Sequence, residues 1–229
     1  MKILAFDTSL GACTVTAVAD GRIISERSER RERGHAEALI PMVLEVLQEA
    51  EVEYDGFDLI ATTVGPGSFT GVRVAVAAAR GMALATGIRT VGVTTTAALV
   101  QTAWATATDA TSILAIIDAR REEAYAQLFD AEGDRLVSRW EGPRLDSLAN
   151  LVTNLKEETG IVVGSGAAGF RQCVTDPSHW RDAGSVVPHG AAVANAALAS
   201  VDADGKALPP APLYLRPPST SHPRQEGER

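Results

Sequence analysis

The sequence predicts an α/β protein made of two copies of one folding unit, with the second copy shortened. Each copy opens with an apolar strand that ends in aspartate: Ile3–Phe6 before Asp7, and Ile113–Ile117 before Asp118. A hairpin follows each strand, and the copies start about half a chain apart. A repeated supersecondary unit outranks local motifs as a fold signal, so we expect a duplication. A β-meander that leads into alternating helices and strands, present twice, is the plan of the actin-like ATPase (ribonuclease H-like) fold.

The two hairpins share one order of elements. In the first, Cys13–Ala19 alternates between apolar and polar residues, Asp20-Gly21 signals a turn, and Ile23-Ile24 begins a third strand. In the second, strands at 124–129 and 135–137 flank a turn of polar residues. Each hairpin therefore adds two antiparallel strands to the strand that ends in aspartate.

Two helices are expected between the copies. The first, at about His35–Glu51, is apolar on more than one face and contains Pro41 early, where proline is tolerated or bends the helix. The second, at Val72–Thr86, follows an apolar strand at Asp58–Val64, and its alanines let another helix approach closely. The surplus apolar surface is expected to be buried within the chain or against a partner. The residues assigned to a partner interface are His35, Leu39, Leu44, Val74, Ala78 and Met82.

A glycine-rich stretch, Gly65-Pro66-Gly67-Ser68-Phe69-Thr70-Gly71-Val72-Arg73, begins where this strand ends. Glycine and proline at this density mark a tight turn, and Ser68 and Thr70 are good caps for the helix. Free amides at a helix start are also what an anion site needs, although the spacing matches neither G-x-G-x-x-G nor a P-loop. A structural turn and a vestigial nucleotide or anion loop both stay open. The residues of such a loop would be Asp7, Gly65, Gly67, Ser68, Thr70, Gly71, Arg73 and Asp118.

The second half of the chain carries fewer elements. A helix is expected at Asp146–Thr159, a strand at Ile161–Val163 and a last helix from Gly190, before a proline-rich segment. The expected organisation starts with an N-terminal actin-like domain at 1–103, which carries the partner-binding helices, and a smaller second actin-like domain at 104–189. A C-terminal helical segment at 190–216 is expected to pack back on the first domain, and a disordered tail follows at 217–229.

Composition narrows the class of function. With 229 residues, 45% of them hydrophobic, the chain is expected to be globular, without a membrane span or signal peptide. A net charge of −8 argues against nucleic-acid binding by this chain alone. The arginines within 27–33 alternate with glutamates, which favours a solvated strand edge or loop over an RNA patch. Two cysteines and four scattered histidines form no ligand cluster, so we expect a cytoplasmic protein without a metal.

The groups that catalysis would need are incomplete. A nucleophile elbow at Ser68 would need glycine at positions 66 and 70, where proline and threonine stand. An ATP site would need glycine-rich hairpin turns, but the turn after Asp7 has one glycine and the turn at 118–123 has none. Glu122 and Glu123 there would repel phosphate. Asp7 and Asp118 could hold magnesium or cap their strands, and we favour capping.

Five motifs carry a resemblance to a known family. They are Ile3-Leu4-Ala5-Phe6-Asp7-Thr8-Ser9, His35-Ala36-Glu37-Ala38-Leu39-Ile40-Pro41, the glycine stretch 65–73, Ile117-Asp118-Ala119-Arg120 and Pro212-Leu213-Tyr214-Leu215-Arg216. They run from end to end of the chain, and the glycine stretch is highly specific. The sequence resembles the bacterial TsaB (YeaZ) proteins of tRNA threonylcarbamoyladenosine synthesis, which are shortened, non-catalytic paralogues of TsaD.

This resemblance implies a scaffold or dimerisation subunit rather than an enzyme. The complex transfers threonylcarbamoyl from threonylcarbamoyl-AMP to N6 of adenosine 37 in tRNAs that read ANN codons. The implied partners are TsaD, through the N-terminal helices, and the ATPase TsaE, with tRNA reached through the complex and a homodimer when the chain is alone. No cofactor is expected, since ATP or ADP would bind only at the partner complex. TsaD holds its metal through paired histidines, and His35 has no second histidine one turn on.

Two other functions stay open. One is a stand-alone enzyme of the actin-like superfamily, either a small-molecule kinase or a glycoprotease-like peptidase. The other is a homodimer with a separate regulatory role. The missing glycine turns and metal ligands argue against the enzyme.

Overall fold

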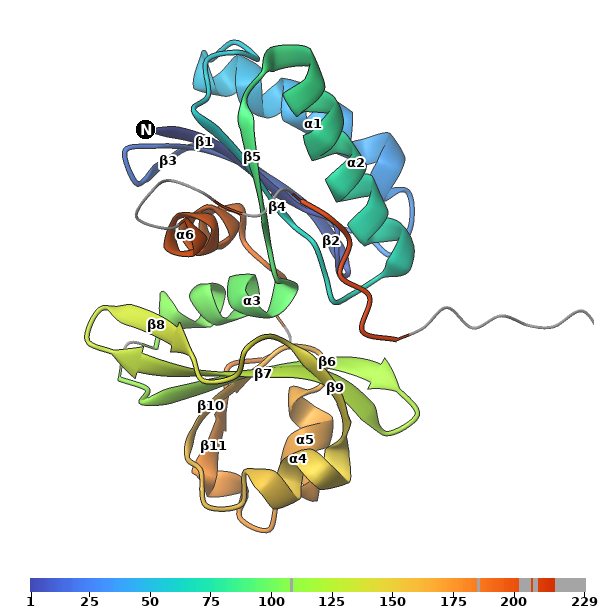
Figure 1. The fold of residues 1–229 in the computed structure, drawn as a ribbon, viewed down its shortest axis with the longest axis vertical. Helices are drawn as coiled ribbons and strands as arrows, with labels where there is room; N and C mark the ends of the chain where they lie inside the picture. The colour runs from blue at the N-terminus through green and yellow to red at the C-terminus, as the bar shows by residue number, and fades with distance from the viewer. Residues whose placement is uncertain (108, 185, 202–206, 208–209, 217–229) are drawn as a thin grey trace, which may run out of the picture.

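The computed structural model describes residues 1–107, 109–184, 186–201, 207 and 210–216. Two mixed sheets are stacked with helices on both sides of each, as Figure 1 shows. Helices α1 (His35–Ala50) and α2 (Phe69–Thr86) cover the outer face of the first sheet. Helices α3 (Thr95–Trp104) and α6 (Gly190–Ser200) lie between the sheets. Helices α4 (Leu148–Asn154) and α5 (Ala167–Cys173) cover the far face of the second sheet.

The first sheet has the strand order β3-β2-β1-β4-β5. Strand β1 pairs antiparallel with β2 and parallel with β4, so it lies at the centre. The strands are β1 (Lys2–Asp7), β2 (Ala12–Ala19), β3 (Arg22–Arg30), β4 (Leu59–Thr63) and β5 (Arg89–Val93). Strand β3, which holds the mixed-charge stretch, forms one edge, where charged side chains reach water.

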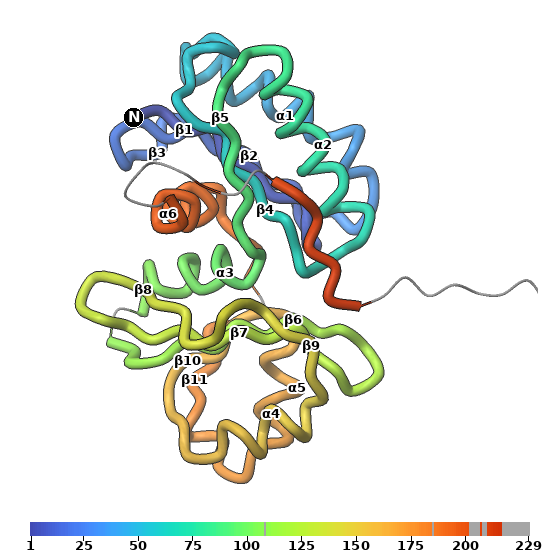
Figure 2. The backbone as a smooth tube through the Cα atoms, in the orientation of Figure 1, coloured from blue at the N-terminus to red at the C-terminus, as the bar shows by residue number. Residues whose placement is uncertain are grey.

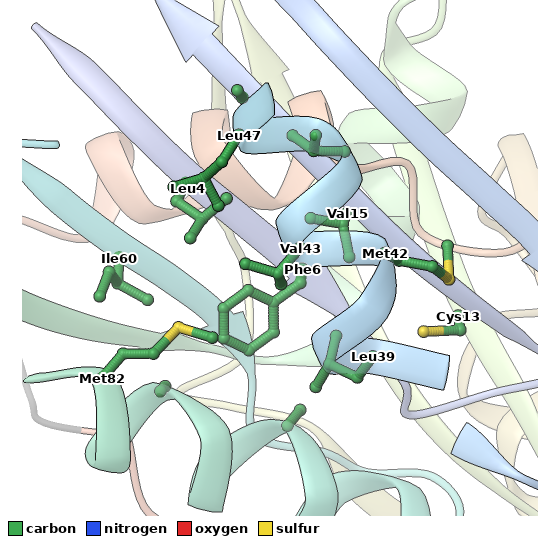
Figure 3. Close-up of a cluster of buried hydrophobic side chains, with 14 of the residues drawn as sticks. Leu4, Phe6, Cys13, Val15, Leu39, Met42, Val43, Leu47, Ile60 and Met82 are labelled. Carbon is green, nitrogen blue, oxygen red and sulfur yellow. The ribbon is translucent and has the colours of Figure 1, made fainter. Parts of the chain in front are cut away.

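Both faces of the first sheet are buried because its strands carry apolar residues on both sides. Leu4 and Phe6 point towards α1 and α2, where Leu39, Val43 and Met82 meet them (Figure 3). The alternate residues of β1, such as Ile3, pack against α6 on the opposite face. A strand buried on both faces is continuously apolar, and this explains the unbroken run at the start of the sequence.

The second sheet has the order β11-β10-β6-β7-β8, with β9 paired to β7. Leu114 and Ile116 of the central strand face α4 and α5, while Ile113 and Ala115 face α3. The strands are β6 (Ser112–Arg120), β7 (Glu123–Glu132), β8 (Arg135–Ser138), β9 (Arg144–Ser147), β10 (Gly160–Val163) and β11 (Trp180–Asp182). The meander of β6, β7 and β8 repeats that of β1, β2 and β3, and the duplicated actin-like fold is confirmed.

Several elements differ from the sequence predictions. In place of the helix expected at 146–159, the structure has strand β9 followed by the short helix α4. The helix starts only after Ser147, because the Ser147 hydroxyl accepts a hydrogen bond from the Asn150 amide and caps it. Helix α2 starts at Phe69, three residues early, since Ser68 is its cap. The C-terminal helix ends at Ser200.

Five further elements of the described chain were not predicted: β5, α3, α5, the 3-10 helix η1 (Pro177–His179) and β11. The predicted tail at 217–229 lies outside the described residues, and the domain boundaries stay predictions. In the described part of the chain, no helix has both the length and the apolar character to cross a membrane.

Candidate functional site

The turn after β1 is closed by the side chain of Asp7, which is wholly buried. Its Oδ1 atom accepts hydrogen bonds from the Ser9 amide at 3.1 Å and from the hydroxyls of Ser9 and Thr63. Among the described residues, its Oδ2 atom has no hydrogen-bond partner. Burial raises the pKa of Asp7, against smaller lowering effects of these hydrogen bonds. The carboxyl group therefore belongs to the interior of the fold.

The glycine stretch packs directly on this turn. A Cβ atom at Gly67 would lie 2.3 Å from the Ser9 carbonyl oxygen, and one at Gly71 would lie 1.9 Å from the Thr8 carbonyl oxygen. The Ser68 amide donates to the Ser9 oxygen at 2.7 Å, and the Thr8 hydroxyl donates to the Gly71 oxygen at 2.7 Å. The two glycines are thus needed for close contact between backbones.

The start of α2 has few amides left for an anion. The Gly71 amide donates to the Ser68 hydroxyl at 3.3 Å, and the Val72 amide donates to the Ser68 carbonyl. Within the described chain, only the Phe69 and Thr70 amides of this first turn have no acceptor. Gly65 adopts a left-handed backbone with φ of 107°, and its carbonyl accepts from the Thr95 amide.

A cavity of about 380 Å³ lies between the two sheets, next to this turn. Ser9 and Ser68 line it from the first half of the chain, and Asp118, Arg120 and Ser165 line it from the second. Asp118 Oδ1 accepts from the Arg120 amide at 2.7 Å, so this carboxylate caps the turn of its own hairpin. Asp7 and Asp118 therefore do not meet at one point in the cavity, because Asp7 does not line it.

This cavity does not fit a magnesium–nucleotide complex. The buried Asp7 does not line the cavity, and the Ser68, Gly71 and Val72 amides of the glycine stretch already donate to acceptors within the protein. The opposite turn consists of three residues in the left-handed region, Arg120, Arg121 and Glu122, without a glycine. In the residues that the structure describes, no cluster of three or more His, Cys, Asp or Glu is arranged to hold a metal.

A second feature is the outer face of α1 and α2, termed here the helix face: Ile40, Leu44, Ala78, Gly81, Leu84 and Ala85. Leu84 is 90% exposed and Leu44 is 52% exposed. A shallow cavity of about 470 Å³ on this face is lined mostly by apolar residues of both helices, together with Thr86 and, from the loop after α1, Tyr54. Isolated exposed apolar residues are common, but a contiguous patch with a hollow marks an interaction surface.

A third feature is the C-terminal segment 210–216, termed here the strap, drawn in red in Figures 1 and 2. The Leu213 amide donates to the Val64 carbonyl at 2.7 Å, which fixes the strap to the end of the first sheet. The Arg216 guanidinium donates to the Ala119 carbonyl at 3.0 Å and pairs with Glu123, both in the second sheet. The strap therefore bridges the two halves of the chain.

The comparisons with known proteins agree on one family. The family described as "TsaD: tRNA N6-adenosine threonylcarbamoyltransferase" matches residues 22–211. The Escherichia coli "tRNA threonylcarbamoyladenosine biosynthesis protein TsaB" is 38% identical over 55% of this chain and 53% of its own length. The Haemophilus influenzae protein of the same name is 29% identical over 75% of both chains. The structure "YeaZ from Pseudomonas aeruginosa" superimposes with a TM-score of 0.81 at 28% identity, covering 93% of this chain and 99% of that one.

The chain belongs to the TsaB (YeaZ) family. An uncharacterized protein of Mycobacterium tuberculosis is also similar, at 32% identity over 94% of this chain and 92% of its own length. The match spans about half the length of the E. coli relative.

In this TsaB-family chain, the interface residues predicted from the sequence differ in their burial and orientation. Leu44 is exposed, and Val74 and Ala78 are half-buried. His35 and Leu39 point inward instead: Leu39 lies in the core, and His35 Nε2 lies 3.2 Å from the Leu10 carbonyl oxygen. Met82 is largely buried yet lines the hollow of the helix face.

Residues of the predicted nucleotide or anion loop line two different cavities. Gly67 and Ser68 line the cavity between the sheets, whereas Arg73 points to a neighbouring cavity beside the strap. Sequence reasoning missed Tyr125, Tyr214 and Arg216. The motif 212–216 was the only signal for Tyr214 and Arg216, and Tyr125 had none, because their contacts join segments far apart in sequence.

Proposed function

We propose that this TsaB-family chain is a non-catalytic subunit of the machinery that makes threonylcarbamoyladenosine in tRNA. The coarse role follows from the names of its relatives, which are biosynthesis proteins for this modified nucleoside. In the finer proposal, a TsaD-type partner transfers threonylcarbamoyl from threonylcarbamoyl-AMP to N6 of adenosine 37 in tRNAs that read ANN codons, and the ATPase TsaE assists.

The observation that carries the scaffold role is the helix face. Its exposed leucines and small residues fit close packing against another helix pair, as alanine and glycine allow short distances between helices. We propose that this face binds the TsaD-type partner, and a second copy of this chain when the partner is absent.

The proposed absence of catalysis rests on the cavity between the sheets. Asp7 is enclosed, Asp118 caps its own turn, and the hydroxyls of Ser9 and Ser68 have no imidazole beside them in that cavity. An acid or base must reach the proton that it moves, and the carboxylate that lines this cavity, Asp118, is already held by the Arg120 amide of its own turn. The protein would contribute by fixing the shape of its partner.

The test is association with a TsaD-type protein of the same organism, measured by size-exclusion chromatography and calorimetry. Leu44→Glu or Ala78→Glu should weaken association by about 2–4 kcal/mol, since a charge would be buried without a partner. Leu198→Glu is the matched control: Leu198 is 41% exposed on α6, away from the helix face, and its substitution should leave association unchanged.

An undiminished complex with both variants would remove the helix face from the interface. Thermal unfolding of each variant separates loss of binding from loss of fold.

A further inference from the structure

A cavity of about 500 Å³ lies beside the strap, away from the helix face. Its walls come from three separate segments: the start of α2, the strand β7 and the strap itself. Phe69, Arg73, Tyr125, Tyr214 and Arg216 provide most of its chemistry. This volume lies within the range of small-molecule pockets, and it is large enough for a nucleoside monophosphate.

The aromatic side chains of this cavity are unusually open. Phe69 is 52% exposed and Tyr214 is 45% exposed, and their ring centroids lie 5.3 Å apart. Tyr125 lines the cavity from the second sheet. Open aromatic rings that gather around a hollow offer stacking faces, and every nucleobase has a flat face to stack on them.

The cation of the cavity is Arg73. Its guanidinium carbon lies 3.8 Å from the centre of the Phe69 ring, and its Nε donates to the Tyr214 hydroxyl at 2.7 Å. These contacts orient the guanidinium but do not neutralise it, and no carboxylate in the described chain pairs with Arg73. By contrast, Arg216 pairs with Glu123 and contributes little net charge.

We infer that this cavity is a binding site for a nucleoside monophosphate. The rings would hold the base by stacking, and the Arg73 guanidinium would attract the phosphate, because a planar guanidinium donates well to phosphate oxygens. The nucleotide comes either from solution or as an unpaired nucleotide of an RNA chain. This site is distinct from the cavity between the sheets, although Gly67, Tyr125 and Arg216 line both.

The site does not depend on association through the helix face, so the two proposals fail separately. Its test is isothermal titration calorimetry of the full chain with AMP, adenosine and inorganic phosphate. AMP should bind saturably with a Kd below about 1 mM. Adenosine and phosphate should each bind at least about tenfold more weakly than AMP.

Substitutions in the cavity test which side chains bind AMP. Arg73→Gln and Tyr214→Leu should each weaken AMP binding about tenfold or more, whereas Tyr214→Phe, which keeps the ring, should weaken it less. Arg80→Gln is the matched control, since Arg80 is exposed on the same helix two turns away and does not line the cavity. Its affinity for AMP should equal that of the original chain. Circular dichroism and thermal unfolding check that each variant is folded.

A single-stranded RNA pentanucleotide distinguishes the two sources. If it binds about tenfold more tightly than AMP, and Arg73→Gln removes that gain, the natural ligand is an RNA nucleotide. If AMP binds as tightly as the RNA, the natural ligand is a free nucleotide. The absence of saturable AMP and RNA binding in the original chain, or unchanged binding by Arg73→Gln, would overturn the inference.

Discussion

At the scale of single residues, Asp7 links burial to stability. The folded chain keeps the proton on this carboxyl group at pH values where the unfolded chain has released it, because its pKa is raised by burial. The free energy of unfolding therefore falls as the pH rises from about the ordinary value of 3.8 to the raised pKa of the folded state, and the loss persists above it.

Substitution of Asp7 by asparagine should remove this pH-dependent loss of unfolding free energy. Asparagine keeps an oxygen for the donors on Ser9 and Thr63 but has no charge to bury. We expect Asp7→Asn to be at least as stable as the original chain at neutral pH, with a flatter dependence of unfolding free energy on pH. Urea unfolding at a series of pH values measures this, with the exposed Asp134→Asn as control. A large loss of stability at neutral pH would mean that the folded state holds Asp7 ionised.

The glycines of α2 give a second residue-level prediction. Gly71→Ala should destabilise the fold by about 2–4 kcal/mol, because the new methyl group would collide with the Thr8 carbonyl oxygen. Gly81→Ala in the same helix meets no atom within 4 Å and should stabilise it by about 0.5–1 kcal/mol. Thermal unfolding of both variants compares the two effects, and equal stabilities would contradict the packing explanation for the motif.

At the scale of elements, the turn between β6 and β7 carries local strain. Arg120, Arg121 and Glu122 have φ values of 65°, 57° and 61°, a region that side chains with a Cβ atom disfavour. Three such residues in succession cost about 1–3 kcal/mol each, which the surrounding contacts must offset. Arg216 holds both sides of this turn, through the Ala119 carbonyl and the Glu123 carboxylate.

Glycine should relieve that strain. We expect Arg121→Gly to raise the free energy of unfolding by about 0.5–1 kcal/mol, whereas Arg135→Gly, in strand β8, should lower it by a similar amount. Chemical denaturation measures both. If Arg121→Gly is destabilising, an interaction of the Arg121 side chain outweighs the strain of its backbone.

The elements that the sequence predicts well are those in which apolar runs and polar turns differ clearly along the chain. The apolar strands that end in Asp7 and Asp118 are visible in the sequence because apolar runs and polar turns alternate there. Strand β5 and helix α3 escaped prediction, since their alanine- and threonine-rich segment has little contrast between faces. Segment 190–216 was expected to pack back on the first domain, but the cavity beside the strap could not be predicted, because Arg73 and Tyr214 meet across 141 residues of sequence and no local pattern encodes that contact.

At the scale of the whole molecule, the strap connects two halves that also meet through α3 and α6. The predicted helices α1 and α2 formed near their expected positions, but the inward orientation of His35 and Leu39 depends on how α1 packs on the sheet. Periodicity alone leaves that choice open when a helix is apolar on more than one side. The assembly of the two halves was therefore less predictable than each half.

The position of α6 has a consequence for synthesis of the chain on the ribosome. Residues 190–200 cover the face of the first sheet that carries Ile3 and Ala5, yet they leave the ribosome long after the strands of that sheet. Until then, the strands made first have one apolar face without its native cover, and such surfaces favour aggregation. A fragment of residues 1–103 should for this reason be poorly soluble when expressed alone. Addition of a separate peptide containing residues 190–200 should improve its recovery in the soluble fraction.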